Sequence, residues 1–360
     1  MLKFALVGCG RIAKRHSELL GFEKIKGALL VAVCDINEEK AKKIGEQFDI
    51  PYFTDMDEMM KNQSIDVVSI LTESGLHAKH VINLAKYGKH LVVEKPMALT
   101  LEDADQMISA CNKNNSKLFV IKQNRFNVPV LKLHEALNSG RFGKLVLGTV
   151  RVRWARTQSY YDQDSWRGTW AFDGGVLTNQ ASHHVDMLEW MMGDVESVFA
   201  KANTSLVNIE AEDTAVVTLK FKNGALGIIE ATTATRPHDL EGSISILGEK
   251  GSVVISGFAV NKMQTWSFEQ KQEGDDEVLD KYSVNPPNIY GFGHQAYYEH
   301  VVDSIINNKK QLVDGISGKK SLELIVAIYN SIESGKEVFL KSNPANCRLG
   351  KNNEKQTYFG

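Results

Sequence analysis

Short apolar runs alternate with amphipathic segments along the first third of the chain. The runs Phe4–Val7 and Leu29–Cys34 are typical of buried strands. Each is followed by helical spacing of apolar residues, from Ile12 to Leu20 and over Asn37–Phe48. Strands that alternate with helices of this length predict right-handed βαβ units and a parallel sheet. The series is expected to continue through Tyr52-Phe53, Asp57–Lys61, Val67–Leu71, Ala78–Tyr87, Leu91–Val93, Leu101–Lys113 and Leu118–Ile121.

The second part of the chain has a different pattern, in which strand-like runs follow one another between turn signals such as Lys222-Asn223-Gly224. Consecutive strands joined by loops of hairpin length predict an open, mostly antiparallel sheet. A helix from about Val176 to Met192 is expected beside it. The expected strands are Lys144–Arg156, Val195–Asn203, Thr214–Phe221, Ala225–Thr233, Ser243–Leu247, Ser252–Ser256 and Met263–Glu269, and the other expected helices are Pro129–Ser139, Phe292–Asn307 and Ser317–Ser334.

These patterns predict two domains. We expect an α/β domain with a parallel sheet and helices on both faces over residues 1–122, an α+β domain over residues 123–340, and a polar tail over residues 341–360. The length of 360 residues agrees with this division, because one domain usually takes roughly 150 residues. A composition of 43% hydrophobic and 24% charged residues is that of an ordinary globular protein.

Charge and cysteine usage narrow the possible partners. The chain has 42 basic and 44 acidic residues, so no overall positive charge favours a nucleic acid. No apolar run is long enough to span a membrane, and the apolar N-terminus is expected to be a strand and not a signal peptide. Cys9 and Cys34 fall inside expected strands, and the four cysteines show no CxxC or metal-ligand spacing. We therefore expect free thiols, a cytoplasmic protein and no bound metal.

A glycine loop joins the first expected strand to the first expected helix. The residues Gly8-Cys9-Gly10-Arg11-Ile12-Ala13 fit the pattern G-x-G-x-x-G/A, in which the glycines permit a tight turn and a close approach of a pyrophosphate to the helix N-terminus. Asp35 ends the second expected strand, where a carboxylate accepts both ribose hydroxyls. The pattern favours NAD over NADP, because an acidic residue repels a 2′-phosphate. The alternative is a glycine turn in another kind of α/β domain.

The motif Glu94-Lys95-Pro96 follows the fifth expected strand directly. Ligands of an open parallel sheet bind outside the carboxyl ends of the strands, so Lys95 is expected to point into the cofactor crevice. The alternative is a solvated loop lysine.

A polar stripe is predicted along the helix that precedes the antiparallel sheet. Asn179, His183, Asp186 and Trp190 are spaced by four, three and four residues and share one helical face. Such groups are costly to bury unless they are paired or used, and a histidine is the usual acceptor of a hydroxyl proton. His183 and the neighbouring His184 cannot both face the same way. The alternative is an interface helix whose polar residues are satisfied.

Together these features resemble the glucose–fructose oxidoreductase, inositol dehydrogenase and rhizopine-catabolism superfamily. The resemblance covers roughly residues 1–340 and rests on the order of the motifs: strand–GxGxxA–helix, the Asp that closes the second strand, Glu-Lys-Pro, and the Gly-Gly…His-x-x-Asp helix before an open sheet. It implies an NAD-binding Rossmann domain, a second domain whose sheet mediates dimers or tetramers, and a sugar site between the two domains.

The resemblance also implies roles for single residues. Lys95 matches the lysine that holds the substrate hydroxyl and the nicotinamide ribose, His183 the general base, and Asp186 an acidic residue that binds the substrate. Asn179 stands where many inositol and sugar dehydrogenases carry Asp, which suggests a subfamily, and Ala181 similarly replaces a common Gly. Further cofactor contacts are expected at Gly8, Gly10, Arg11, Ile12, Asp35, Thr72, Glu73, His77 and Glu94, and further substrate contacts at Asn124, Arg125 and Asn179.

The segment from Tyr160 to Trp170, together with Asn179-Gln180-Ala181-Ser182-His183-His184, resembles a nucleotide-sugar branch of the superfamily. That branch includes the UDP-N-acetyl-2-amino-2-deoxyglucuronate 3-dehydrogenases, which supply 3-keto sugars to an aminotransferase in surface-polysaccharide pathways.

Arginines and aromatic residues gather in the same region and favour an anionic, ring-bearing ligand. Guanidinium groups bind phosphates and carboxylates with two hydrogen bonds, and aromatic rings stack on a base or a sugar. The alternative is that Arg151 and Arg153 line the solvent or oligomer face of a sheet. From this cluster we expect Trp166 and Arg167 to contact the cofactor, and Arg153, Arg156, Tyr161 and Arg236 to contact the substrate, with His238 near the same loop.

The sequence therefore predicts an NAD-dependent dehydrogenase that oxidises a ring hydroxyl, at C3, of a UDP-sugar and forms a homo-oligomer. Three alternatives stay open: a UDP-N-acetylglucosamine 3-dehydrogenase, an inositol or free-sugar dehydrogenase, and a non-catalytic NAD-sensing protein on the same fold.

Overall fold

The computed structural model describes residues 1–283, 292–340 and 347–351. The predicted polar tail falls largely outside these ranges. Within them the chain forms two compact units, one from Met1–Lys122 with His294–Leu322 and one from the described part of Gln123–Gly293 and of residues 323–360. Among the described helices, none combines the length and the apolar character of a membrane span.

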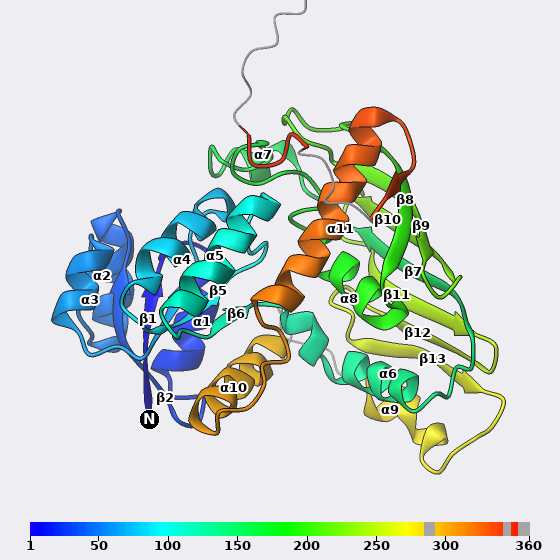
Figure 1. Ribbon diagram of the computed structural model, residues 1–360, viewed down its shortest axis with the longest axis horizontal. Helices are drawn as coiled ribbons and strands as arrows, with labels where there is room; N and C mark the ends of the chain where they lie inside the picture. The colour runs from blue at the N-terminus through cyan, green and yellow to red at the C-terminus, as the bar shows by residue number, and fades with distance from the viewer. Residues whose placement is uncertain (284–291, 341–346, 352–360) are drawn as a thin grey trace, which may run out of the picture. The chain divides into compact units, whose positions relative to one another are not determined.

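A six-stranded parallel sheet forms the centre of the first unit (Figure 1). Its strand order is β3-β2-β1-β4-β5-β6, the order of a doubly wound dinucleotide-binding fold. The central strand β1 pairs with β2 on one side and β4 on the other, with Val7 opposite both Cys34 and Ile70. The strands are β1 (Leu2–Val7), β2 (Ala28–Cys34), β3 (Tyr52–Phe53), β4 (Val67–Ile70), β5 (His90–Val93) and β6 (Leu118–Val120).

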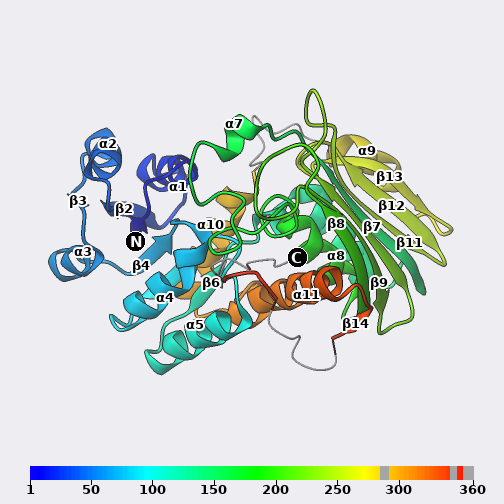
Figure 2. The same cartoon turned by 90° about the horizontal axis from the view of Figure 1, so that it is seen from above.

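Two helices of the first unit begin at side chains that cap them. Asn37 accepts a hydrogen bond from the Lys40 N–H at the start of α2, and Thr100 accepts one from the Asp103 N–H at the start of α5. Helices α4 and α5 pack side by side (Figure 2). The predicted alternation is confirmed, with helices α1 (Ala13–Gly21), α2 (Glu38–Phe48), α3 (Met56–Asn62), α4 (His77–Ala85) and α5 (Leu101–Lys113) and a short 3₁₀ turn η1 (Ser74–Leu76).

A late segment of the chain completes the first unit. Helix α10 (Gly293–Ile306) and the first part of α11 (Gly315–Ser334) belong to this unit by their contacts, which differs from the expectation that residues 123–340 form one domain. The physical reason is the buried face of α10. The ring of Tyr298 packs edge-on against Phe4 of β1 at 5.7 Å between centroids, and it is fully buried.

An eight-stranded sheet forms the second unit, in the order β13-β12-β11-β7-β10-β9-β8-β14. All its pairs are antiparallel except β7 with β10, which run parallel with Arg151 opposite Glu230. The expectation of an open, mostly antiparallel sheet is confirmed. The strands are β7 (Leu145–Arg153), β8 (Val195–Asn203), β9 (Thr214–Phe221), β10 (Leu226–Thr232), β11 (Glu241–Gly248), β12 (Gly251–Ser256), β13 (Lys262–Phe268) and β14 (Val338–Phe339).

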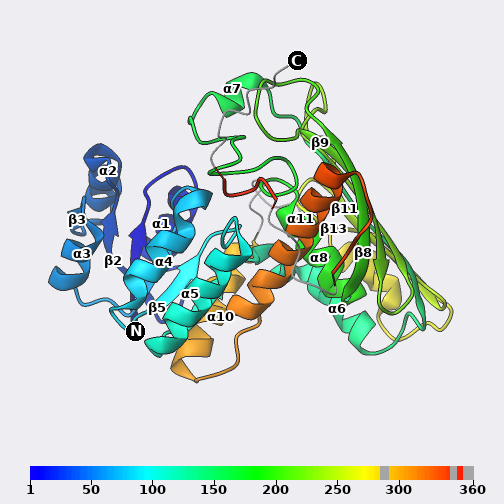
Figure 3. The same cartoon turned by 45° about the horizontal axis from the view of Figure 1, so that its top comes forward.

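Helices α8 (Ser182–Met192) and α11 lie on the same face of this sheet (Figure 3). A side chain at Gly148 of β7 would collide with Leu188 and Met192 of α8, so this glycine lets the helix lie close to the sheet. Helix α8 begins at Ser182, six residues later than expected. The remaining elements of the second unit are η2 (Gln123–Phe126), α6 (Val128–Asn138), α7 (Gln158–Tyr161), η3 (Asp275–Glu277) and α9 (Val278–Lys281).

Candidate functional site

The glycine loop of the first unit has the geometry that a dinucleotide requires. Gly8 has φ +94, and a Cβ there would lie 2.8 Å from the backbone of Leu71 and Thr72, so only glycine fits. A Cβ at Gly10 would meet nothing within 4 Å among the described residues. The backbone is therefore open at Gly10, directly before the N-terminus of α1, where an anion is favoured.

Asp35 ties this loop to the end of β2. Its carboxylate accepts hydrogen bonds from the N–H of Cys9 at 2.7 Å and from the N–H of Asn37 at 2.8 Å. A carboxylate has about four lone-pair positions, so these two bonds leave capacity for the ribose hydroxyls that the sequence predicts it to bind. Arg11 is exposed, and Ile12 is half-buried at the start of α1. The loop and Asp35 fit an NAD molecule.

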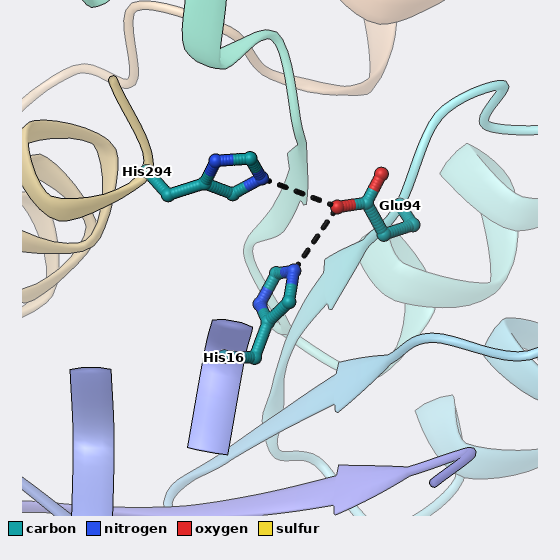
Figure 4. Close-up of side chains that lie close together, drawn as sticks. All are labelled: His16, Glu94 and His294. Atoms are coloured by element: carbon teal, nitrogen blue, oxygen red, sulfur yellow. Dashed lines mark hydrogen bonds and ion pairs between the residues drawn. The ribbon is translucent and has the colours of Figure 1, made fainter. Parts of the chain in front are cut away.

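Glu94, at the end of β5, is the centre of a buried polar cluster (Figure 4). One carboxylate oxygen lies 3.0 Å from Nε2 of His16 and 3.6 Å from Nε2 of His294. The other oxygen accepts the backbone N–H of Lys95 at 2.9 Å. Glu94 thus fixes the backbone of the lysine that the sequence singled out. The cluster was not anticipated, because no sequence pattern links α1, β5 and α10.

Hydrogen bonds hold this cluster in one charge state. Burial alone would raise the pKa of Glu94, but the hydrogen bonds from His16 and His294 keep it well below its usual value. Burial lowers the pKa of His16, so its ring is neutral. Its Nδ1 lies 2.6 Å from the Tyr298 hydroxyl, which in turn lies 2.9 Å from the hydroxyl of Ser69. A neutral His16 can donate to Glu94 and accept from Tyr298 at the same time.

The same cluster brings three metal-ligating atoms within 4.8 Å of one another. The expectation that no metal is bound stays a prediction. The hydrogen-bond geometry accounts for the cluster without one, because the 3.0 Å separation of His16 and Glu94 is the length of an N–H···O bond.

The loop after β4 is joined to the Lys95 loop through His77. This histidine is buried, and its two ring nitrogens lie 2.7 Å from the Pro96 carbonyl oxygen and 3.0 Å from the Thr72 carbonyl oxygen. Burial lowers the pKa of His77. Thr72 contacts His80 through its hydroxyl at 3.0 Å. Thr72 and His77 therefore shape the loop that the sequence predicts to cover the cofactor.

In the second unit, helix α8 directs the side chains of the neighbouring His183 and His184 to different sides. His184 faces the sheet: its ring lies edge-on to Trp154, and its Nε2 lies 3.2 Å from the position of a Cβ on Gly242. Burial lowers the pKa of His184 to about 3, so it stays neutral. Successive helical residues point about 100° apart, and this arrangement favours His183 as the candidate base.

The turn before α8 carries Asn179, which therefore does not lie on the helix as expected. Its amide nitrogen donates to Asp173 at 2.6 Å. Two bonds from the other side hold the turn: the Glu212 carboxylate accepts the Leu177 N–H at 3.0 Å and the Tyr329 hydroxyl at 3.0 Å. Turn bonds of this kind are set by residues far apart in sequence, so the periodicity alone suggested a longer helix.

Arg125 and Asp186, both expected to bind substrate, bind each other. The guanidinium donates through Nε at 2.7 Å and Nη2 at 2.8 Å to the two carboxylate oxygens. Both side chains are buried, and the guanidinium lies 4.9 Å from the Trp190 ring centre. Paired charges of this kind position each other. Asn124 is half-buried in η2, next to Arg125.

The four arginines between residues 151 and 167 divide into two groups. Arg151 and Arg153 lie on the face of the sheet opposite to α8, where both pair with Glu230 and Glu241. Arg153 donates to Glu230 at 2.6 and 2.8 Å. The structure thus favours the alternative that these two residues line a solvent or oligomer face, and Arg153 is left out of the candidate site.

The other arginines lie around Tyr160. The guanidinium carbons of Arg156 and Arg167 lie 5.4 and 4.7 Å from its ring centre, within the range of cation–π contacts. Arg156 also pairs with Asp239, and Arg167 with Asp164. Arg167 further contacts the Trp166 ring at 4.8 Å.

Arg236 and Tyr161 have roles in the local structure. Arg236 donates to the backbone carbonyls of Arg156, Thr233 and Thr235 at 2.8 to 3.1 Å. The Tyr161 hydroxyl lies 3.0 Å from that of Thr233, and burial raises the pKa of Tyr161 to about 12. A cavity of about 250 Å³ lies next to this segment, below the volume usual for a ligand pocket. Arg167 and Tyr161 are among the residues that line it.

Comparison with known proteins finds a matching family model for each of the two units. Residues 2–122 match the model of the oxidoreductase family NAD-binding Rossmann fold, and residues 134–340 match that of the oxidoreductase family C-terminal alpha/beta domain. Both models describe the GFO/IDH/MocA family.

Individual solved structures and curated proteins are also similar to this chain. The WlbA dehydrogenase of Bordetella pertussis, in complex with NADH and UDP-GlcNAcA, is 40% identical, with a TM-score of 0.87, over 94% of this chain and 98% of that one. The WlbA dehydrogenase of Chromobacterium violaceum, with the same ligands, is 43% identical, with a TM-score of 0.88, over 94% and 95%. The myo-inositol 2-dehydrogenase of Thermotoga maritima is 29% identical over 94% of this chain and 99% of that protein.

The glycine loop, the carboxylate that ends β2 and the matches over both units lead to one assignment. The chain belongs to the GFO/IDH/MocA oxidoreductase family and is an NAD-dependent oxidoreductase that acts on a CH–OH group.

Proposed function

We propose that this protein oxidises the C3 hydroxyl of a UDP-sugar, UDP-N-acetyl-2-amino-2-deoxyglucuronate, to a 3-keto sugar that a later amination consumes. The observation that carries the proposal is the 40–43% identity, over 94% of the chain, to two dehydrogenases crystallised with NADH and UDP-GlcNAcA.

The residues of the first unit bind and orient the cofactor. NAD, when bound, supplies the hydride acceptor. Gly8 and Gly10 give the pyrophosphate access to backbone N–H groups, and Asp35 accepts the ribose hydroxyls. Lys95, with its backbone fixed by Glu94, donates a hydrogen bond to the reacting hydroxyl. The expected contact of Glu94 with the cofactor stays a prediction, since its carboxylate already serves three donors.

The second unit supplies the base. His183 accepts the hydroxyl proton while the C–H carbon gives its hydride, which carries both electrons, to the cofactor. The alcohol becomes a ketone by this loss of one proton and one hydride. The charge of Asp186 is balanced by that of Arg125. Asp186 therefore adds no net negative charge to a site that must accept an anionic sugar. Arg156, Arg167, Tyr161, Trp166 and Arg236 remain predicted contacts of the nucleotide sugar or cofactor.

Replacement of His183 by Ala tests the assigned base. We expect turnover to fall roughly 10²–10⁴-fold, the usual contribution of a general base, with the affinity for NAD unchanged. Turnover and NAD binding are measured on the same preparation, and its Tm is compared with that of the wild type to verify folding. Turnover near the wild-type value would contradict the assignment.

Substrate class is tested with UDP-hexosamines that carry or lack the 6-carboxylate. The formation of reduced cofactor is followed by absorbance, with and without a 2-keto acid that could reoxidise it in place. We expect turnover with the carboxylate-bearing sugar. Turnover only with UDP-N-acetylglucosamine or a free polyol would favour an alternative substrate. NAD binding without turnover of any of these compounds would favour an NAD sensor.

We also propose that the protein forms a homo-oligomer through its eight-stranded sheet. The face of this sheet opposite to α8 exposes large apolar side chains on neighbouring strands, and apolar patches of this kind mark interfaces. These side chains are Phe199 on β8, Val216 on β9, and Leu226 and Ile228 on β10. A cytoplasmic location stays a prediction; the four cysteines are free and buried, as a reducing compartment would allow.

A further inference from the structure

Hydrogen bonds hold the backbone at both ends of the dipeptide Lys95-Pro96. The N–H of Lys95 donates to the Oε2 atom of Glu94 at 2.9 Å. The carbonyl oxygen of Pro96 lies 2.7 Å from Nδ1 of His77, which is the first residue of α4. Glu94, Pro96 and His77 are all buried. The dipeptide is therefore held at its N–H end and at its carbonyl end.

A second buried histidine acts on the N–H end through Glu94. His16 of α1 is fully buried, and its Nε2 lies 3.0 Å from Oε1, the Glu94 oxygen that does not bind Lys95. Figure 4 shows the rings of His16 and His294 directed at this oxygen. Burial lowers the pKa of His16 and of His77, so both rings are neutral at pH 7.

The partners of these two rings indicate which nitrogen carries the hydrogen. A neutral histidine has one N–H and can donate from only one nitrogen. At His16 the ionised Glu94 only accepts, so the hydrogen is on Nε2, and Nδ1 accepts from the Tyr298 hydroxyl at 2.6 Å. At His77 the nearer acceptor faces Nδ1, because the Thr72 carbonyl oxygen lies farther away, 3.0 Å from Nε2. The two rings therefore carry their hydrogens on opposite nitrogens.

The ring of His16 is itself fixed by side chains of α10. The hydroxyl of Tyr298 lies 2.9 Å from the hydroxyl of Ser69, and both residues are fully buried. The ring of His294 packs edge-on against that of His16, at 5.3 Å between ring centroids. These contacts keep the His16 ring from turning over, so its Nε2 stays directed at Glu94.

We propose that His16 and His77 are positioning residues that place Lys95 for the reaction, His16 through Glu94 and His77 through Pro96. Loss of either bond lets the backbone of Lys95 shift and moves its amine away from the reacting hydroxyl. A displacement of about 1 Å at a reacting group can lower turnover about 100-fold. The inference rests on the proposed function for the role of Lys95, but the bonds that hold the dipeptide do not depend on it.

Asparagine and glutamine replace the two ring nitrogens one at a time. The amide nitrogen of asparagine is as many bonds from Cα as histidine Nδ1, and that of glutamine is as many as Nε2. His16→Gln should therefore keep turnover within a few-fold of the wild type, whereas His16→Asn should lower kcat about 10–100-fold. At position 77 the order reverses: His77→Asn should keep turnover, and His77→Gln should lower kcat by a similar factor.

Two further measurements do not depend on turnover. Exchange of the amide hydrogens of residues 95–99 with deuterium should be about tenfold faster in His16→Asn than in His16→Gln, and about tenfold faster in His77→Gln than in His77→Asn, the usual effect of losing one such bond. In the wild type, ¹⁵N NMR of the histidine rings should find the hydrogen on Nε2 of His16 and on Nδ1 of His77.

The control is His90→Gln, at the other end of β5, where Nδ1 of His90 accepts the Lys117 N–H at 3.1 Å. It should leave kcat and the exchange of residues 95–99 unchanged, and the Tm of every variant is measured to verify folding.

Equal losses for asparagine and glutamine at either position would show that the histidine only fills space, and would overturn the proposal. The opposite tautomer at His16 or His77 in the wild type would also overturn it, even if a variant does not fold. If the wild type turns over no UDP-sugar, the proposed function fails, while the exchange rates and the tautomers still decide whether the histidines hold the dipeptide.

Discussion

Glu212 shows how one buried side chain can make stability depend on pH. Burial raises its pKa from the ordinary value of 4.5 to about 7, and the hydrogen bond from the Leu177 N–H offsets only part of this effect. The folded protein therefore keeps a proton on Glu212 between pH 4.5 and 7 that the unfolded chain has released. Stability should fall as pH rises through this window, because the native state binds more protons there.

The variant Glu212→Gln tests this dependence. Glutamine keeps an acceptor for the Leu177 N–H and the Tyr329 hydroxyl but cannot ionise. We expect the wild type to lose about 3 kcal/mol of unfolding free energy between about pH 4.5 and 8 through this group, and the variant to lose much less. Denaturant unfolding at several pH values measures the difference. The exposed Glu273→Gln is the control, and identical pH profiles for wild type and Glu212→Gln would contradict the expectation.

At the scale of elements, the turn before α8 depends on two neighbouring glycines for different reasons. Gly174 has φ +78, which favours glycine. A Cβ on Gly175 would overlap the carbonyl oxygen and the carboxyl group of Glu212, and neither can move without breaking the bonds that hold the turn. Gly175 is therefore required by its packing against Glu212.

Replacement of Gly175 by Ala should destabilise the second unit by about 3 kcal/mol, the cost of forcing atoms into a filled space. Gly140→Ala is a useful comparison, since its Cβ would meet nothing within 4 Å among the described residues and only its φ of +74 is unfavourable, at a cost of about 1–2 kcal/mol. Thermal and denaturant unfolding of the two variants would rank them. Equal losses of unfolding free energy in the two variants would mean that Glu212 moves aside to make room for the new Cβ at position 175.

Most elements followed from the sequence because their signals are local. The apolar run of β1 and the capping residue Asn37 predict a strand and a helix start without reference to the rest of the chain. The start of α8 could not be placed this way. Asn179 has the right spacing for the helical stripe, but its bond to Asp173 and the Glu212–Tyr329 bond keep residues 174–181 in a turn.

The sequence predicts the candidate site as a set of residue types more than as a set of contacts. Lys95 and Asp35 are predicted as site residues from their positions after strands, and these roles stay predictions. The sequence did not predict that Arg125 and Asp186 bind each other. A contact between η2 and α8 produces no recognisable pattern in the sequence of either segment. For the two arginines of β7, the sequence left open whether they bind a ligand or line a solvent or oligomer face. The register of the sheet, which places Arg151 opposite Glu230, favours the second alternative.

At the scale of the whole molecule, the exposed apolar face of the second sheet predicts self-association. Leu226 and Ile228 are 56% and 38% exposed on neighbouring outward positions of β10. We expect Leu226→Lys/Ile228→Lys to lower the mass of the assembly, because two charges in an apolar interface are costly to bury. Light scattering after size-exclusion chromatography measures the mass.

Leu240→Lys, at a residue that is 65% exposed outside the strands, is the matched control and should keep the wild-type mass. The proposal of an interface on this sheet fails if the double variant also keeps that mass, or if the wild type is already a monomer.

The return of His294–Leu322 to the first unit has a consequence for synthesis on the ribosome. Residues 1–122 emerge first, but Glu94 and His16 receive His294 and Tyr298 only after the strands β7 to β13 of the second sheet have been made. Until then a carboxylate destined for burial lacks one of its partners, and the surface that Tyr298 covers on Phe4 is open. The nascent cofactor-binding half stays incomplete while the rest of the protein is translated.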